Sequence, residues 1–152
     1  MEWHPKGTVI LAGSADGTLW MWNVPSGTCM NVFTGHSGPV SCGGFTPNGK
    51  HIISGSEDGC VFVWDPKTAT IIHKFGPLHE ASVNVMAMHP ESQLVLTGAQ
   101  DGTAKLIHIG NGRVCSSFPC DFNPDICRFS LRLGNTPTRS NLSRFVKPYH
   151  LL

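Results

Sequence analysis

The sequence lacks a long apolar run and a charge excess. Its longest apolar stretches, such as Val9–Ala12 and Leu94–Leu96, are far too short to span a bilayer. The 152 residues hold 11 Lys and Arg against 10 Asp and Glu, so electrostatics gives no reason to expect a nucleic-acid partner. We therefore expect neither membrane insertion nor nucleic-acid binding by the bulk of the chain.

Signatures of a secreted, metal-binding or catalytic protein are also missing. The six cysteines include no Cys-x-x-Cys pair, and no signal-peptide pattern precedes them, which favours reduced thiols in an intracellular protein. No pair of histidines has zinc-like spacing, and no nucleophile elbow or metalloprotease helix is present. We expect no metal, no cofactor and no enzyme activity, in a protein of the cytoplasm or alternatively the nucleus.

What the sequence does contain is an internal repeat. Asp-Gly dipeptides begin at Asp16, Asp58 and Asp101, a period of about 42–43 residues, each between two apolar runs rich in β-formers. Tight turns at a period in the low forties are typical of a propeller built from four-stranded blades. The repeat therefore predicts an all-β fold.

The units differ in completeness. Residues 35–77 read as a complete blade, 78–118 as a degenerate blade, and 1–34 as an incomplete one that begins inside its innermost strand. Residues 119–152 are predicted to be an irregular basic tail, although Ile126–Leu131 has the composition of one strand of a further blade. The strands expected in the two later units are Val40–Phe45, His51–Ser54, Cys60–Trp64, Thr70–Phe75, Val83–Met88, Gln93–Thr97, Thr103–Ile109 and Arg113–Phe118.

The middle unit carries Gly35-His36 before its first strand and Trp64-Asp65 at the end of its third. With these dipeptides the chain resembles the WD-repeat family over roughly residues 1–118. The resemblance implies a buried hydrogen-bond chain from Trp64 to Ser54, His36 and Asp58. An indole only donates, a hydroxyl and a neutral imidazole do both, and a carboxylate only accepts, so this order leaves no polar group unpaired.

The outer units keep only parts of this tetrad. The third unit has His79, Thr97 and Asp101, with Ile107 at the position of the tryptophan. The first unit has Asp16 and Trp22, but it has Ala12 in place of the hydroxyl residue and no upstream histidine. Only the middle blade is expected to hold a complete tetrad.

Other segments resemble a narrower subfamily, that of the angio-associated migratory cell proteins. They are Glu2–Pro5, Leu11–Gly17, Trp20–Trp22 and the stretch from Cys42 to Lys50. Its fungal counterpart is a chaperone that guards a newly made large-subunit ribosomal protein until it joins the ribosome. The resemblance implies a scaffold for protein partners, with a ribosomal protein as the sharper hypothesis.

Recognition is expected on loops at one end of the blades, because propellers bind through rigidly held loops. Position alone selects five candidates for partner binding: Ala15, Ser41, Glu57, Asn84 and Gln100. The alternating Trp20 and Trp22 point to one face of a strand, where core packing is expected.

Two alternatives remain open. In the first alternative, the tail binds RNA, because its basic residues are interleaved with Phe129 and Phe145. These basic residues are Arg128, Arg132, Arg139, Arg144 and Lys147. In the other, the chain is a truncated or aberrant propeller fragment with no independent function. Three blades do not close a ring, and this leaves sheet faces and edges exposed.

Overall fold

The computed structural model describes residues 1–119 and contains no helix among them, so no helix of this part could cross a membrane. The described residues form three four-stranded antiparallel sheets. The first sheet has β1 (Glu2–Trp3), β2 (Val9–Gly13), β3 (Leu19–Asn23) and β4 (Thr28–Phe33); the second has β5 (Val40–Phe45), β6 (Ile52–Ser56), β7 (Val61–Trp64) and β8 (Ile71–Phe75); the third has β9 (Val83–Met88), β10 (Leu94–Ala99), β11 (Thr103–His108) and β12 (Arg113–Pro119).

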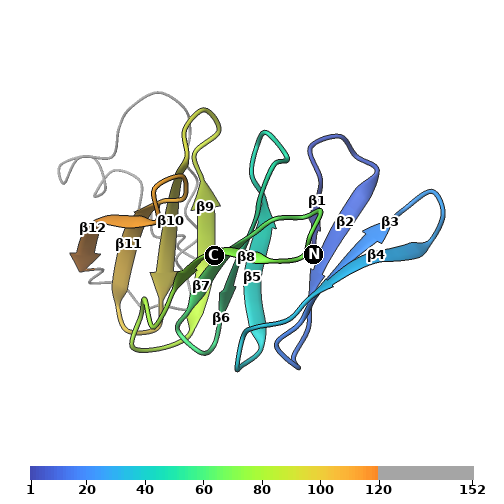
Figure 1. Cartoon of the computed structure of the whole chain (residues 1–152). Coiled ribbons are helices and arrows are strands. Elements are labelled where there is room, and N and C mark those ends of the chain that lie inside the picture. The colour runs from blue at the N-terminus through green and yellow to red at the C-terminus, as the bar shows by residue number, and fades with distance from the viewer. Residues whose placement is uncertain (120–152) are drawn as a thin grey trace, which may run out of the picture.

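Each sheet is a meander in which strands pair in chain order, and the three sheets stand side by side in the same order (Figure 1). The first strands of neighbouring sheets lie next to each other, since β1 contacts β5 and β5 contacts β9. The predicted all-β fragment of about three blades is confirmed. Predicted and observed strand ends differ by at most two residues. The predicted tail, including Ile126–Leu131, lies outside the described residues.

The Asp-Gly turns have a common backbone geometry. Gly17, Gly59 and Gly102 have φ values of +85°, +76° and +73°, in the left-handed region that side chains disfavour. At Gly59 space is a second reason for glycine, because a Cβ there would collide with the carbonyl oxygen of His79. The sheets can therefore approach closely at this end.

Apolar side chains fill the two spaces between the sheets. Between the first and second sheets, Phe62 and Trp64 pack against Leu11, Leu19 and Phe33, all of them at most 3 % exposed. Burying each such side chain contributes about 1.5–3 kcal/mol. The space between the second and third sheets is filled by a separate cluster that includes Ile53, Val63, Val83, Val95 and Ile107.

The repeat extends to backbone irregularities. The register between the third and fourth strands of each sheet shifts at Met21/Trp22, Val63/Trp64 and Leu106/Ile107, which are equivalent positions. A bulge at this point increases strand twist. The three sheets are thus copies of one unit in backbone as well as in sequence.

Candidate functional site

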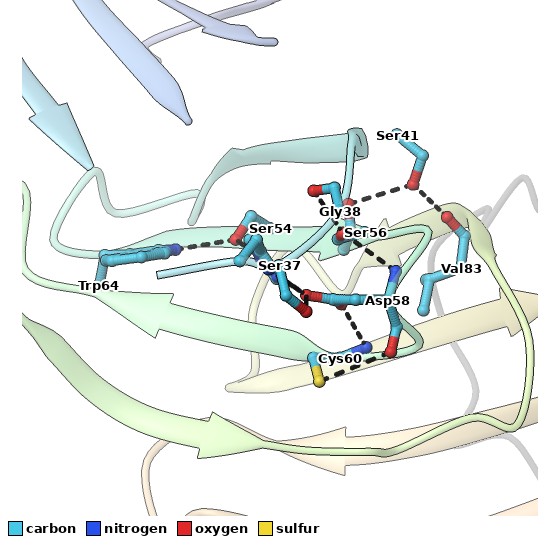
Figure 2. Close-up of polar contacts among 11 residues, drawn as sticks. Ser37, Gly38, Ser41, Ser54, Ser56, Asp58, Cys60, Trp64 and Val83 are labelled. Atoms are coloured by element: carbon cyan, nitrogen blue, oxygen red, sulfur yellow. Dashed lines mark hydrogen bonds and ion pairs between the residues drawn. The ribbon is translucent and has the colours of Figure 1, made fainter. Parts of the chain in front are cut away.

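The structure brings the four residues of the expected middle tetrad together. The Trp64 indole Nε1 donates to Ser54 Oγ at 2.8 Å, Ser54 Oγ lies 2.8 Å from His36 Nε2, and His36 Nδ1 lies 3.1 Å from Asp58 Oδ2. Figure 2 shows the bond from Trp64 to Ser54 and the contacts around Asp58. Trp64 and Ser54 are fully buried, and the side chains of His36 and Asp58 are 0 % and 9 % exposed. The chain of hydrogen bonds therefore runs from the interior of the sheet to the turn that holds Asp58.

The order of donors fixes the protonation of His36. Because Ser54 Oγ accepts from the Trp64 indole, its single hydrogen is free to point at His36 Nε2. Nε2 then accepts, so the neutral ring carries its proton on Nδ1 and donates it to Asp58. In this arrangement every polar atom of the four side chains has a partner.

Asp58 is held as a carboxylate at the outer end of this hydrogen-bond chain, which we call the relay. Its Oδ2 accepts from the Ser37 amide at 2.9 Å, and its Oδ1 accepts from the Cys60 amide at 2.8 Å. Burial alone would raise the pKa of Asp58, but these amide bonds and the contact with His36 outweigh burial and lower the pKa to about 2. Burial lowers the pKa of His36, although the neighbouring Asp58 opposes the shift. Both groups therefore keep the protonation states that the relay needs at neutral pH.

Aromatic rings hold the His36 imidazole in place. It stacks on Phe62 with ring centroids 4.1 Å apart and planes 5° apart, and it meets Trp64 edge-on at 6.2 Å. A ring fixed on one face and at both nitrogens has one orientation. The tetrad thus has a structural role, because its hydrogen bonds and ring contacts hold His36 in one orientation and leave none of its groups free for acid–base chemistry.

The third sheet has a modified version of this hydrogen-bonded tetrad. His79 Nε2 lies 2.9 Å from Thr97 Oγ1, and His79 Nδ1 lies 3.1 Å from Asp101 Oδ2 and 2.9 Å from Thr103 Oγ1. Since Ile107 cannot donate to Thr97, the threonine hydroxyl is free to turn toward the Lys105 carbonyl, 3.2 Å away. Burial lowers the pKa of His79 against the opposing charge of Asp101. For Asp101, hydrogen bonds from Thr103 and the Glu80 amide outweigh burial and lower the pKa.

The first sheet uses its tetrad positions differently. Asp16 accepts from the amide and the hydroxyl of Thr18, at 2.9 and 2.6 Å, and these bonds lower its pKa. The Trp20 indole, rather than that of Trp22, donates to Thr18 Oγ1 at 2.8 Å. The two tryptophans stack on each other with centroids 5.9 Å apart. Both are half-buried and outside the core, so the expectation of core packing for this pair was wrong.

The residues missed by sequence reasoning are the hydroxyls two positions after the turn aspartates. Thr18 and Thr103 both donate to their aspartate, and Thr103 also contacts His79. Positions 18, 60 and 103 each follow a turn aspartate by two residues, and this shared register is the signal that could have identified Thr18 and Thr103. Each turn aspartate is therefore stabilised by hydrogen bonds from the residue two positions after it.

Hydrogen bonds between sheets join the loops at this end into one rim. We define the rim as the loops that lead into β3, β5, β7, β9 and β11, namely residues 14–18, 34–39, 57–60, 76–82 and 100–102. The Val40 amide donates to the Ser14 carbonyl, and the amides of Leu78 and His79 donate to the Gly59 carbonyl. These bonds, all 3.0 Å long, cross from one sheet to the next.

The five predicted partner-binding residues fall into two groups on or beside the rim. Ala15, Glu57 and Gln100 are exposed. The Ser41 hydroxyl instead lies within hydrogen-bond reach of the carbonyls of Gly55 and Val83, which links β5 to β9, as Figure 2 shows for Val83. Asn84 Oδ1 accepts from the Ser82 hydroxyl at 2.9 Å. The first group is available to a partner, whereas the oxygens of the second are engaged within the chain.

The charged residues of the rim loops are all acidic. These loops contain the carboxylates of Asp16, Glu57, Asp58, Glu80 and Asp101 and no Lys or Arg. Glu57 and Glu80 are exposed, and neither was paired with a cation among the described residues. The ammonium group of Lys105, which comes from β11, reaches the rim and is bonded to the Leu78 carbonyl. Loops at the opposite end hold three lysines (Lys6, Lys50 and Lys67) and two carboxylates (Asp65 and Glu91), so the loops at the two ends differ in charge.

Neither a metal centre nor a large cavity is evident within residues 1–119. No group of three or more His, Cys, Asp or Glu in this part could hold a metal ion. A cavity between β2 and β5 measures about 120 Å³, which is small beside the several hundred Å³ of typical ligand pockets. The rim, rather than a pocket, is the candidate functional site.

Comparison with known proteins agrees with this geometry. The family model described as "WD domain, G-beta repeat" matches residues 1–23, 27–65 and 70–108. The human protein named angio-associated migratory cell protein is 42 % identical over 120 residues, which are 78 % of this chain and 27 % of that protein. The periodic tryptophan protein 2 homolog of Dictyostelium discoideum is 38 % identical over 47 residues, 31 % of this chain and 5 % of that protein. None of these proteins is named for a catalytic activity.

Solved structures share the fold. The structure of U3-55K superposes with a TM-score of 0.72 at 20 % identity and covers 76 % of this chain and 37 % of that one. At this identity the likeness concerns the fold alone. The chain spans about a quarter of the length of the human relative.

Proposed function

The chain belongs to the WD40-repeat family, and from this premise we propose that it acts as a protein-interaction scaffold whose rim binds a basic partner. The sharper form of the proposal is that this partner is a newly made large-subunit ribosomal protein. The resemblance to the angio-associated migratory cell protein subfamily motivates that choice of partner.

The observation that carries the proposal is that every charged residue of the rim loops is acidic. Five carboxylates stand on loops that contain no Lys or Arg, and such a surface attracts basic proteins and repels acidic ones. Glu57 and Glu80 are exposed and lie on neighbouring loops joined through the Gly59 carbonyl. A basic segment would meet these two side chains first.

The relays prepare the rim for binding. Asp58 and Asp101 are fixed by backbone amides and by buried histidines, so the loops that carry Glu57 and Glu80 are ordered before a partner arrives. Preorganised loops lose less conformational entropy on binding. The entropy cost of ordering these loops on binding is therefore reduced.

The test is an affinity capture with the 152-residue chain as bait and purified large-subunit ribosomal proteins as prey. Two charge reversals at the rim, Glu57→Lys combined with Glu80→Lys, are compared with Glu91→Lys on the opposite end, where Glu91 is also exposed. We expect at least one ribosomal protein to bind the wild type and the Glu91→Lys control, and to lose about tenfold or more in affinity with the rim variant. Binding should also weaken as salt rises.

Two results would reject the proposal at different levels. If no ribosomal protein binds but another basic protein binds at the rim, the partner class is wrong and the scaffold role stands. If the rim variant and the Glu91→Lys control behave alike toward every prey, the rim is not the binding surface.

A further inference from the structure

The fourth strand of the middle sheet, β8, is an open edge. It pairs with β7 on one side, and its other side meets no strand within residues 1–119. The middle sheet lies between the other two sheets (Figure 1), so this edge is set by the strand order of its own sheet. An unpaired strand edge is a template for another extended segment.

The edge exposes two neighbouring apolar side chains. Ile71 and Ile72 are 39 % and 42 % exposed, and neither belongs to a buried apolar cluster of the described residues. Phe75 of the same strand is buried and packs in the cluster between the second and third sheets. The core therefore uses the end of β8 and leaves the two isoleucines at its start to solvent.

The charged side chains beside the isoleucines are basic. β8 carries Lys74 and no carboxylate, and the exposed Lys67 stands in the turn before the strand. Lys74 Nζ lies over the Phe62 ring, 5.1 Å from its centroid, and no carboxylate of the described residues forms an ion pair with it. The one carboxylate of the turn, Asp65, is half-buried and accepts from the Lys67 amide at 2.8 Å. The edge thus differs in sign from the rim loops.

Ile72 and Lys74 share one face of β8. Successive side chains of a strand alternate between faces, and the register with β7 shifts only before His73. An antiparallel strand added at the edge would place one residue across from Lys74 and the residue two positions later across from Ile72. An acidic and an apolar residue fit these two positions. A second copy of β8 would instead bring another Lys74 and no carboxylate.

We propose that the outer edge of β8 is a strand-addition site for an extended acidic segment of another protein. A carboxylate of the segment pairs with Lys74, and an apolar side chain covers Ile72. In such sites main-chain hydrogen bonds supply the affinity and the side chains supply the selectivity. The site is separate from the rim and does not depend on the function proposed above.

Two acetylated and amidated peptides test the proposal. The first is Glu-Thr-Glu-Thr-Val-Thr-Val, which in antiparallel register places its second Glu across from Lys74 and its first Val across from Ile72. The second has both Glu replaced by Lys. Each is titrated into the 15N-labelled 152-residue chain, its Lys74→Glu variant and a Lys50→Glu control, where Lys50 is also exposed and lies in the turn between β5 and β6. Amide shifts give the Kd values, and sedimentation of the chain alone gives its oligomeric state.

We expect the acidic peptide to shift the amides of residues 70–75 saturably and to bind about fivefold more tightly than the basic peptide. The Lys50→Glu control should keep this preference, and Lys74→Glu should reverse it. A gain in binding of the basic peptide cannot come from loss of folding, so the reversal is informative even if Lys74→Glu lowers stability.

Four results would overturn the proposal. They are the absence of saturable shifts, shifts at the rim in place of β8, equal binding of the two peptides to the wild type, and a preference that Lys74→Glu leaves unchanged. A dimer of the wild type that is lost in an Ile72→Asp variant would assign the edge to a second copy of the chain, and this would overturn the proposal as well.

Discussion

Removal of the hydroxyl at the centre of the relay should cost more in the second sheet than in the third. Ser54 Oγ has two buried side-chain partners, the Trp64 indole and His36 Nε2. Thr97 Oγ1 has one, His79 Nε2, because Ile107 offers no donor. The variants to compare are therefore Ser54→Ala and Thr97→Val.

The expected magnitudes follow from the number of buried groups left without a partner. Each such group costs about 1–3 kcal/mol. Ser54→Ala leaves the Trp64 N–H and His36 Nε2 unpaired, at a total of about 3 kcal/mol allowing for some relaxation. Thr97→Val keeps the side-chain shape and leaves chiefly His79 Nε2 unpaired, at about 1–2 kcal/mol.

The assay is urea unfolding of the 152-residue chain followed by tryptophan fluorescence and circular dichroism. Coincident transitions and an unchanged m-value would show that the midpoint shift measures stability. A cost of Ser54→Ala below about 1 kcal/mol, or no greater than that of Thr97→Val, would refute the count of partners made from the structure.

Acidification should destabilise the fold, because the pKa values of both buried histidines and of Asp58 are lowered, that of Asp58 from 3.8 to about 2. At acidic pH the unfolded chain then binds protons that the folded chain does not. The urea midpoint should therefore fall as the pH drops below about 6.5, where the histidines of the unfolded chain become protonated, and again below about 4, where the aspartate does. A flat or rising midpoint would contradict this. Gly7→Ala should cost about 1–2 kcal/mol from positive φ alone, because nothing lies within 4 Å of its added Cβ. Gly59→Ala should cost clearly more in the same urea assay because of its collision with a carbonyl, and equal costs would disprove that collision. Cys29 is exposed, whereas Cys42 is half-buried and burial raises its pKa to about 11, so labelling mapped by mass spectrometry should modify Cys29 at least tenfold faster at pH 8; similar rates would contradict the shielding of the Cys42 thiol.

Much of the fold was predictable because the repeat appears three times. The spacing of Asp16, Asp58 and Asp101 fixed the turn positions, and β-forming residues between the turns indicated the strands. The middle tetrad was predictable for a different reason. The resemblance to the WD-repeat family implied it, and the order Trp64, Ser54, His36 and Asp58 agrees with that implication because it matches every buried donor to an acceptor.

The face of the first sheet could not be assigned from one strand. Alternation put Trp20 and Trp22 on the same face, but it does not say whether another sheet covers that face. In the second sheet, the equivalent Phe62 and Trp64 are covered by the first sheet and are at most 1 % exposed. Burial of a repeat residue depends on its neighbouring repeat, which local pattern does not reveal.

The charge of the rim was also missed, because it is dispersed in the sequence. Glu80 follows a histidine in a loop with no other charged residue, and Glu57 lies 23 residues earlier, in the turn between β6 and β7. Only the hydrogen bonds around the Gly59 carbonyl show that the two loops are neighbours. Surface clusters of this kind require the arrangement of the sheets.

The relay from indole to carboxylate is the claim on which the account depends, and nitrogen NMR at pH 7 tests it most directly. We predict that His36 is neutral, with its proton on Nδ1 and an unprotonated Nε2, and that the Trp64 indole N–H exchanges more slowly than that of the exposed Trp3. A His36 ring protonated on Nε2, or a Trp64 indole that exchanges as fast as Trp3, would contradict the account.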